Sequence, residues 1–127
     1  MAVELTKSFD HTVLGGLLIF QPDANSNVST GITGNASGEL FVCKIDNTAN
    51  SGAVYVKLVD ANAASPGTTN PDWIFHAAGG ATVSYAIPLG APYSTGLSLW
   101  AVTGAESTGG NSAVDPTNDV IVRIVAS

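Results

Sequence analysis

Charged residues are scarce in this sequence. Four Lys and Arg residues and ten Asp and Glu residues make up 11% of its 127 residues, whereas charged residues make up roughly 25% of an ordinary globular chain. A soluble monomer normally carries a denser mixture of charges on its surface. We therefore expect part of the exterior to be covered by copies of the chain or by another protein. The net charge of −6 and the scattered basic residues also exclude nucleic acid as a partner.

Residues that carry out chemistry are few as well. Cys43 is the single cysteine, so the chain has no intrachain disulfide. Its alternation with Phe41 and Ile45 predicts a buried, inert thiol. The two histidines, His11 and His76, stand in no HxH or HExxH motif, and His76 is expected to be a polar residue on one face of a strand. No serine lies in a GxSxG motif. The sequence therefore predicts no enzyme, no cofactor and no metal site.

The acidic residues most relevant to a site are Asp60, Asp72, Asp115 and Asp119, which stand at strand ends or in loops. Two carboxylates could hydrolyse a glycoside, but the sequence does not set the separation that such a pair needs. The stretch DPTND at residues 115–119 could hold calcium through carboxylate and carbonyl oxygens, but it lacks the EF-hand pattern. Turn formation is the favoured role for these side chains.

Long hydrophobic runs are absent. The longest nearly continuous apolar run covers the eight residues 13–20, and a helix that crosses a bilayer needs about 20. The first residues also lack the basic-then-apolar order of a signal peptide. These features predict a protein that is made in a cytoplasm, is used without passage through a secretory membrane, and has no membrane partner.

What the sequence does contain is a series of apolar segments with a period of two residues. The clearest is AVYVKLVD at residues 53–60, where Val54, Val56 and Leu58 alternate with Tyr55, Lys57 and Val59, so we predict a strand largely buried on both faces. No segment of ten residues has a helical period. The other predicted strands cover residues 13–20, 38–46, 73–77, 82–89, 97–103 and 119–126. The pattern predicts an all-β chain with one domain over residues 1–127, an antiparallel β-sandwich of jelly-roll or immunoglobulin-like type with seven to eight strands.

Several details of this sandwich follow from the same pattern. The polar connection at residues 47–52 predicts that the strands at 38–46 and 53–60 pair as a hairpin. Residues 21–37 are expected to form an exposed loop with one short strand inside it. Pro88 cannot donate a hydrogen bond, so it marks an edge or a bulge, and residues 90–96 are expected to turn a corner.

The last predicted strand is apolar on both faces. Val120, Val122 and Ile124 face one side, and Ile121, Arg123 and Val125 face the other. Such a strand is central in its sheet or covered at a subunit interface. Ile121, Arg123 and Val125 are therefore the predicted subunit contact.

Two further sets of residues are candidates for contacts. Val3, Leu5 and Phe9 in residues 1–12 belong either to an edge strand or to an arm that orders against a partner. Among the aromatic residues, the better candidates for exposure are Tyr93 in the expected corner and Trp100, which faces away from Leu99. Exposed aromatic rings could stack on sugars, although strand aromatics more often fill a core or an interface.

The second part of the chain resembles small structural proteins from the virions of tailed bacteriophages. The segments that carry the resemblance are VYVKLVDA at residues 54–61, PGTTNPDWIF at 66–75, GGATVSYAIPLG at 79–90, YSTGLSLWAVTG at 93–104 and VIVRIV at 120–125. They lie in the stretch from residue 53 to the C-terminus, which is about three fifths of the chain. They are strand and turn segments rather than catalytic motifs, and the first 52 residues take no part in the resemblance.

The resemblance implies a function. Such proteins are often capsid decoration proteins, also called cement proteins, which are rich in β-structure, commonly trimeric, and clamp neighbouring capsomers. It implies a non-enzymatic protein, made in the host bacterial cytoplasm, that binds the major capsid protein on the outer surface of the virion as a homo-oligomer, with a trimer as the expected form. Val3, Leu5 and Phe9 would be the capsid contact. The alternative is a carbohydrate-binding module of a phage tail or fibre that uses Tyr93 and Trp100.

Overall fold

The computed structural model describes residues 16–106 and 114–127, and this part of the chain contains β-strands and no helix. The seven strands are β1 (Leu17–Ala24), β2 (Gly38–Asp46), β3 (Val54–Asp60), β4 (Trp73–Ala77), β5 (Thr82–Tyr93), β6 (Leu97–Val102) and β7 (Val120–Ala126). The predicted all-β class is confirmed, and so is each of the seven predicted strands, with some shifted boundaries.

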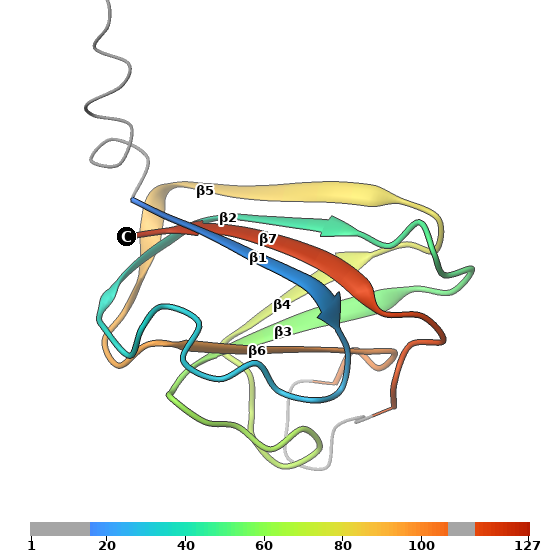
Figure 1. Cartoon of the computed structure of the whole chain (residues 1–127), viewed down its shortest axis with the longest axis horizontal. Coiled ribbons are helices and arrows are strands. Elements are labelled where there is room, and N and C mark those ends of the chain that lie inside the picture. The colour runs from blue at the N-terminus through green and yellow to red at the C-terminus, as the bar shows by residue number, and fades with distance from the viewer. Residues whose placement is uncertain (1–15, 107–113) are drawn as a thin grey trace, which may run out of the picture.

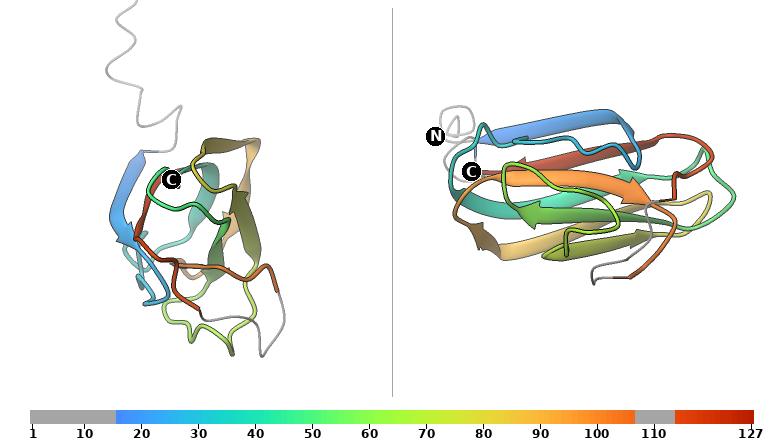
Figure 2. Two further views of the ribbon diagram at one scale, coloured as in Figure 1. Left: turned by 90° about the vertical axis from the view of Figure 1, so that its right-hand side faces the viewer. Right: turned by 90° about the horizontal axis from the view of Figure 1, so that it is seen from below.

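The strands form two antiparallel sheets that pack face to face. Sheet A has four strands in the order β1-β7-β2-β5, and sheet B has three strands in the order β4-β3-β6. In Figure 1 the strands of sheet A run side by side above those of sheet B, and Figure 2 shows the two layers from two further directions. The predicted β-sandwich is therefore confirmed. β7 lies between β1 and β2, which is the first of the two alternatives that the apolar character of both its faces predicts.

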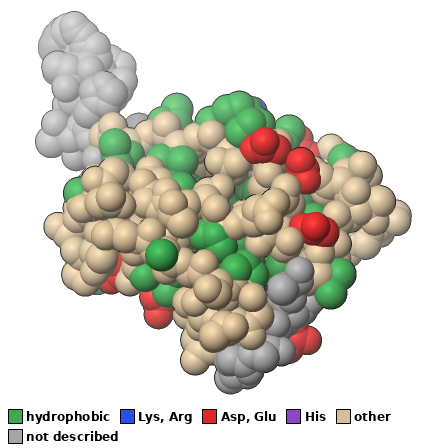
Figure 3. All heavy atoms as spheres, turned by 60° about the horizontal axis from the view of Figure 1, so that its bottom comes forward, with side chains coloured by type: hydrophobic (Ala, Val, Ile, Leu, Met, Phe, Trp, Pro, Cys, Tyr) green, Lys and Arg blue, Asp and Glu red, His purple; other side chains and the backbone are tan. Residues whose placement is uncertain are grey.

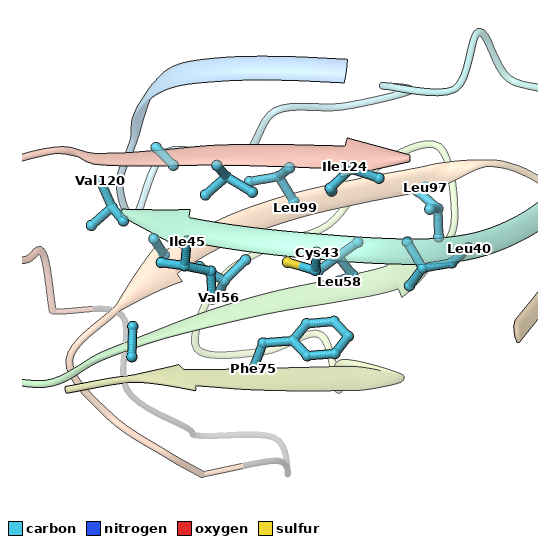
Figure 4. Close-up of a cluster of buried hydrophobic side chains, with 14 of the residues drawn as sticks. Leu40, Cys43, Ile45, Val56, Leu58, Phe75, Leu97, Leu99, Val120 and Ile124 are labelled. Atoms are coloured by element: carbon cyan, nitrogen blue, oxygen red, sulfur yellow. The ribbon is translucent and has the colours of Figure 1, made fainter. Parts of the chain in front are cut away.

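The core lies between the two sheets because alternate residues of each strand point inward. Labelled side chains from five strands converge there in Figure 4, among them Ile45 of β2, Leu58 of β3 and Ile124 of β7. Each of these three side chains is fully buried. β3 is buried on its second face as well, where Lys57 and Val59 are buried too, so the predicted two-sided burial of this strand is confirmed.

The predicted hairpin between β2 and β3 is wrong. β2 pairs with β5 and β7 in sheet A, whereas β3 pairs with β4 and β6 in sheet B. The connection between them crosses the sandwich because the fully buried Asn47 directs it there. The Nδ2 group of Asn47 donates to the carbonyl oxygens of Gly52, Ala77 and Ala78 at 3.0, 3.2 and 3.1 Å. Period-two patterns cannot reveal this choice of partner, because both strands have the same pattern.

A bulge in β2 reverses part of its predicted facing. The sequence places Phe41, Cys43 and Ile45 on one face, but the structure buries Leu40 together with Cys43 and Ile45. The register shifts between Leu40 and Val42 relative to both neighbouring strands. One extra residue in a strand moves the side chains before it to the opposite face. Phe41 and Val42 are consequently half-buried.

The boundaries of β1 also differ from the prediction. The strand runs from Leu17 through Ala24, so residues 21–24, which were expected to be loop, extend the pairing with β7. The short strand expected in the loop is a single bridge between Ser29 and Leu99. Residues 13–15, like residues 1–12 with the predicted contacts Val3, Leu5 and Phe9, lie outside the described residues.

β5 continues through the corner that was expected to follow it. Its pairing with β2 jumps from Ala86 opposite Val42 to Ala91 opposite Leu40, so four residues of β5 face the single residue Phe41. The corner leaves the side chain of Leu89 91% exposed. A glycine is needed next, because Gly90 has a φ of +79° and a Cβ there would approach the Cβ of Glu39 to 2.9 Å.

Candidate functional site

The outer face of sheet A is the part of the described surface where exposed apolar side chains are best organised. Strand pairing places Leu18 opposite Val125, Val125 opposite Val42, and Val42 opposite Ala86. These four residues form a line across all four strands, which we call the apolar row. Their side chains point away from the core, since the neighbouring Leu17, Cys43 and Ile124 point into it.

A second line lies next to the apolar row and contains the basic side chains. Phe20 pairs with Arg123, Arg123 with Lys44, and Lys44 with Ser84. We call these four residues the cationic row. The guanidinium carbon of Arg123 lies 4.8 Å from the centre of the Phe20 ring, a cation–π contact that holds both side chains over the sheet.

The exposure of these residues is high for their type. Leu18 is 78% exposed and Phe20 54% exposed, although a contiguous exposed apolar patch is uncommon on a monomer unless it binds something. Ile121 and Val125 are half-buried and Arg123 is exposed on the same face. The structure thus brings the three predicted subunit-contact residues onto one outward surface, and the contact itself stays a prediction. Leu18 and Phe20 were not predicted as part of this surface, although their alternation with Leu17 and Ile19 signals an outward pair.

The basic residues of the described chain are concentrated on this face. Lys44 and Arg123 are exposed cross-strand neighbours, whereas Lys57 is fully buried in sheet B. Like charges directly opposite each other in a sheet, as Lys44 and Arg123 are, destabilise it.

Asp46 lies one row beyond the cationic row, opposite Ile121. Its hydrogen bonds with Thr48, and to a smaller extent the nearby Arg123, lower the pKa of the Asp46 carboxyl.

The outer face of sheet B is covered and offers no comparable surface. Val59, Trp100 and Val102 form a second buried cluster on this face, packed against Val28, Ala61 and Ala64 from the loops that cross it. Figure 3 views the molecule from the side where these loops lie, and it shows mainly backbone and uncharged polar side chains, with scattered carboxylates and some hydrophobic side chains between them.

Tyr93 and Trp100 are buried, as expected of strand aromatics that fill a core, and the alternative that they are exposed is wrong. Trp100 is fully buried because loops distant in sequence cover its face of the sheet, and its Nε1 atom has no hydrogen-bond partner among the described atoms. Tyr93 is 3% exposed and donates its hydroxyl to the carbonyl oxygen of Ser127 at 2.8 Å. Neither ring is open to a sugar in this structure, so the two residues do not form the carbohydrate-stacking site of the alternative hypothesis.

Lys57 lies beside Trp100 under the same loops. Its Nζ atom donates to the carbonyl oxygen of Glu106 at 2.6 Å. Burial lowers the pKa of Lys57, and the attraction of Glu106 opposes this shift in part. The contact joins β3 to the segment after β6, and this structural role accounts for the burial of a charged group.

Cys43 and His76 occupy the positions that the sequence predicts. Cys43 is buried, and desolvation raises the pKa of its thiol to about 12, so the reactive thiolate is suppressed. His76 is exposed, with its ring centre 5.2 Å from that of Tyr55. Among the residues that the structure describes, neither has the partners that a nucleophile or a general base needs.

The carboxylates hold turns, as predicted. Asp60 accepts hydrogen bonds from the backbone N–H groups of Ser94, Thr95 and Gly96 at 2.8, 2.8 and 3.3 Å. Burial alone would raise the pKa of Asp60, but these bonds outweigh it and lower the pKa. Asp72 accepts from the backbone N–H of Asp60 at 2.8 Å.

Asp115 and Asp119 serve the loop after β1 in the same way. Asp115 accepts from the backbone N–H of Ser26 at 2.8 Å, and Asp119 accepts from the side chain of Asn25 at 3.1 Å. Within residues 16–106 and 114–127, no three His, Cys, Asp or Glu side chains are grouped so that they could hold a metal ion.

Comparisons with known proteins add no relative: no family model, no curated protein and no solved structure matches the chain. In the part of the chain that the structure describes, no helix is long and apolar enough to cross a membrane.

Proposed function

We propose that this chain is a non-enzymatic structural protein of a bacteriophage virion, which binds the outer surface of the capsid as a homo-oligomer and stabilises it. The proposal combines the resemblance of residues 54–125 to such proteins with one structural observation. The outer face of sheet A presents the exposed Leu18 and Phe20 beside the half-buried Ile121 and Val125. A protein that assembles into a shell needs such a surface, and an isolated soluble domain does not.

The roles of the polar residues support a structural function. The carboxylates Asp60, Asp72, Asp115 and Asp119 accept hydrogen bonds from turns and loops, and the Cys43 thiol is buried with a raised pKa. The carboxylates hold turns and loops in place, and the thiol is part of the core. A decoration protein gains modest contacts at each site, and their repetition around a capsid adds up to a substantial stabilisation.

The partners in this proposal are the major capsid protein of the same phage and further copies of the chain. Val3, Leu5 and Phe9 remain the predicted capsid contact, and Ile121, Arg123 and Val125 the predicted subunit contact. The resemblance implies a trimer. The location is the outer surface of the virion, after synthesis in the host cytoplasm, and neither nucleic acid nor a membrane is a partner.

Binding to capsids from which accessory proteins have been removed tests this function. The purified chain should bind saturably, and the particles should then resist heating that releases DNA from bare particles. A variant with Val3, Leu5 and Phe9 replaced by Ser should bind at least tenfold more weakly. The control is Leu89→Ser, which removes an exposed apolar side chain at the corner of β5. Bare particles at saturating protein would disprove the proposal.

A further inference from the structure

Two opposite charges on one strand, Lys44 and Glu39, flank the apolar row on the outer face of sheet A. Lys44 lies in the cationic row, which is the next row of outward side chains after Val42 along β2. Glu39 lies in the next row on the opposite side of Val42. The bulge in β2 places Glu39 in that row: Leu40 pairs with Ala126, and the backbone of Glu39 forms hydrogen bonds with Ser127, which is two residues beyond Val125 on β7. The apolar row therefore has a basic side chain on one side and an acidic one on the other, on the same strand.

We propose that two copies of this chain pack the outer faces of their A sheets together, related by a two-fold axis that runs along the apolar row. The rotation reverses the strand direction and leaves the order of strands unchanged, so each apolar row meets the other. Lys44 of each copy then faces Glu39 of the other copy. An isologous contact requires this kind of self-complementary surface.

The other simple two-fold arrangement is excluded by charge. An axis parallel to the strands would place the two cationic rows against each other, so that Lys44 would face Arg123 of the second copy. Like charges brought together at an interface cost several kcal/mol. A flat apolar face alone would accept both orientations, and the positions of Glu39 and Lys44 select one of them.

The size of the face sets the strength of the contact. Three rows about 6.7 Å apart on four strands about 4.8 Å apart cover roughly 400 Å² of each copy, or roughly 800 Å² for the pair. This lies below the roughly 1,200 Å² at which stable interfaces begin. We therefore expect a dimer that dissociates in the micromolar range or above, which a repetitive shell would strengthen by avidity.

This inference rests on the self-association in the proposed function, but it specifies a two-fold dimer where the resemblance implies a trimer. Sedimentation velocity of the full chain over a wide concentration range tests it. The expected species are a monomer and a dimer in concentration-dependent exchange. A monomer at the highest concentration, or a trimer without a dimer, would overturn the inference.

Substitutions identify the surface that is used. Leu18→Asp should weaken the dimer at least tenfold, because it places a charge in the apolar row at a side chain already 78% exposed. The matched control is Val114→Asp, which changes a 62% exposed side chain whose carbonyl bonds Thr103 after β6, and it should leave the dimer unchanged. Equal dimer affinities for wild type and Leu18→Asp would overturn the inference.

A charge exchange tests the orientation. Lys44→Glu and Glu39→Lys should each weaken the dimer severalfold, and the double variant should restore it. The two side chains of one copy are two rows apart, about 13 Å, which exceeds the screening length of about 8 Å at physiological salt. Restoration therefore reports a contact between copies, and an additive loss in the double variant would contradict the proposed axis.

Capsid binding separates this inference from the proposed function. A chain that dimerises as described but leaves capsids bare supports the inference and refutes the function. A chain that coats capsids as a trimer supports the function and refutes the two-fold dimer.

Discussion

Replacing Asn47 by Ala should be among the most destabilising polar substitutions in this chain. Asn47 is fully buried, and its Nδ2 group donates to carbonyl oxygens of the β2–β3 and β4–β5 connections. Its Oδ1 atom accepts from Asn50 at 2.8 Å, and Asn50 in turn bonds Asn118 before β7. One side chain therefore holds three connections together at one end of the sandwich.

The magnitude follows from the bonds that are lost. The two N–H groups and one oxygen of the amide make about three hydrogen bonds, each worth about 1 kcal/mol net, so the loss is about 3 kcal/mol. The entropy of unfolding is about 2.1 cal/mol/K per residue, or roughly 0.27 kcal/mol/K for this chain. The melting temperature should fall by about 11 °C.

Thermal unfolding followed by circular dichroism measures this change. Asn47→Asp should cost at least as much as Asn47→Ala, because it directs a carboxylate oxygen at carbonyl oxygens. Asn27→Ala is the matched control, since Asn27 is exposed, and it should stay within about 0.5 kcal/mol of the wild type. A change of less than 0.5 kcal/mol in Asn47→Ala would show that the amide does not hold the connections together.

Three further predictions concern single groups. At neutral pH the free energy of unfolding of Lys57→Met should lie within about 1 kcal/mol of the wild type, because the substitution removes a buried charge and keeps the side-chain volume. Lys57→Ala should lower the free energy of unfolding by about 2–4 kcal/mol. Equal losses of unfolding free energy for the two variants in urea would contradict this. As the pH rises toward 10, the stability of the wild type should increase relative to that of Lys57→Met. The lowered pKa lets Lys57 release its proton in the folded state at a lower pH than in the unfolded state. Asp60→Ala should lower the free energy of unfolding by about 1 kcal/mol near pH 7. In melting curves the difference in stability from the wild type should disappear as the pH falls through the lowered pKa of Asp60, because the wild type then loses its charged acceptor. A stability difference that does not depend on pH would refute the role of the charge. Cys43 should resist thiol reagents in native protein and react fully in urea, since it is buried with a pKa of about 12, and rapid native labelling would show that the core opens.

The strands could be predicted from the sequence because their signal is local. β7 is the clearest case: the alternation of Val120 to Val125 predicted both faces correctly, and the lack of a polar face predicted its central position. The burial of Cys43 follows from the same alternation. Each of these properties depends on a few neighbouring residues.

The properties that could not be predicted depend on residues far apart in the chain. The separation of β2 and β3 into different sheets depends on bonds from Asn47 to residues 52, 77 and 78. Trp100 is buried by loops that are distant in sequence. The bulge between Leu40 and Val42 is decided by both neighbouring strands at once. The candidate surface was accordingly predicted in part, through Ile121, Arg123 and Val125, while its outer edge at Leu18 and Phe20 was missed.

The place of β7 in sheet A determines when this protein can fold. Among the described strands β1 pairs with β7 alone, and β2 needs β7 on one side. During synthesis neither strand can be completed until residues 120–126 have left the ribosome, so the sandwich assembles late and through contacts between distant segments. In that interval the apolar strands are open to wrong pairing with neighbouring chains. A chain shortened by its last strand would therefore be expected to aggregate during production rather than to accumulate as a weakened sandwich.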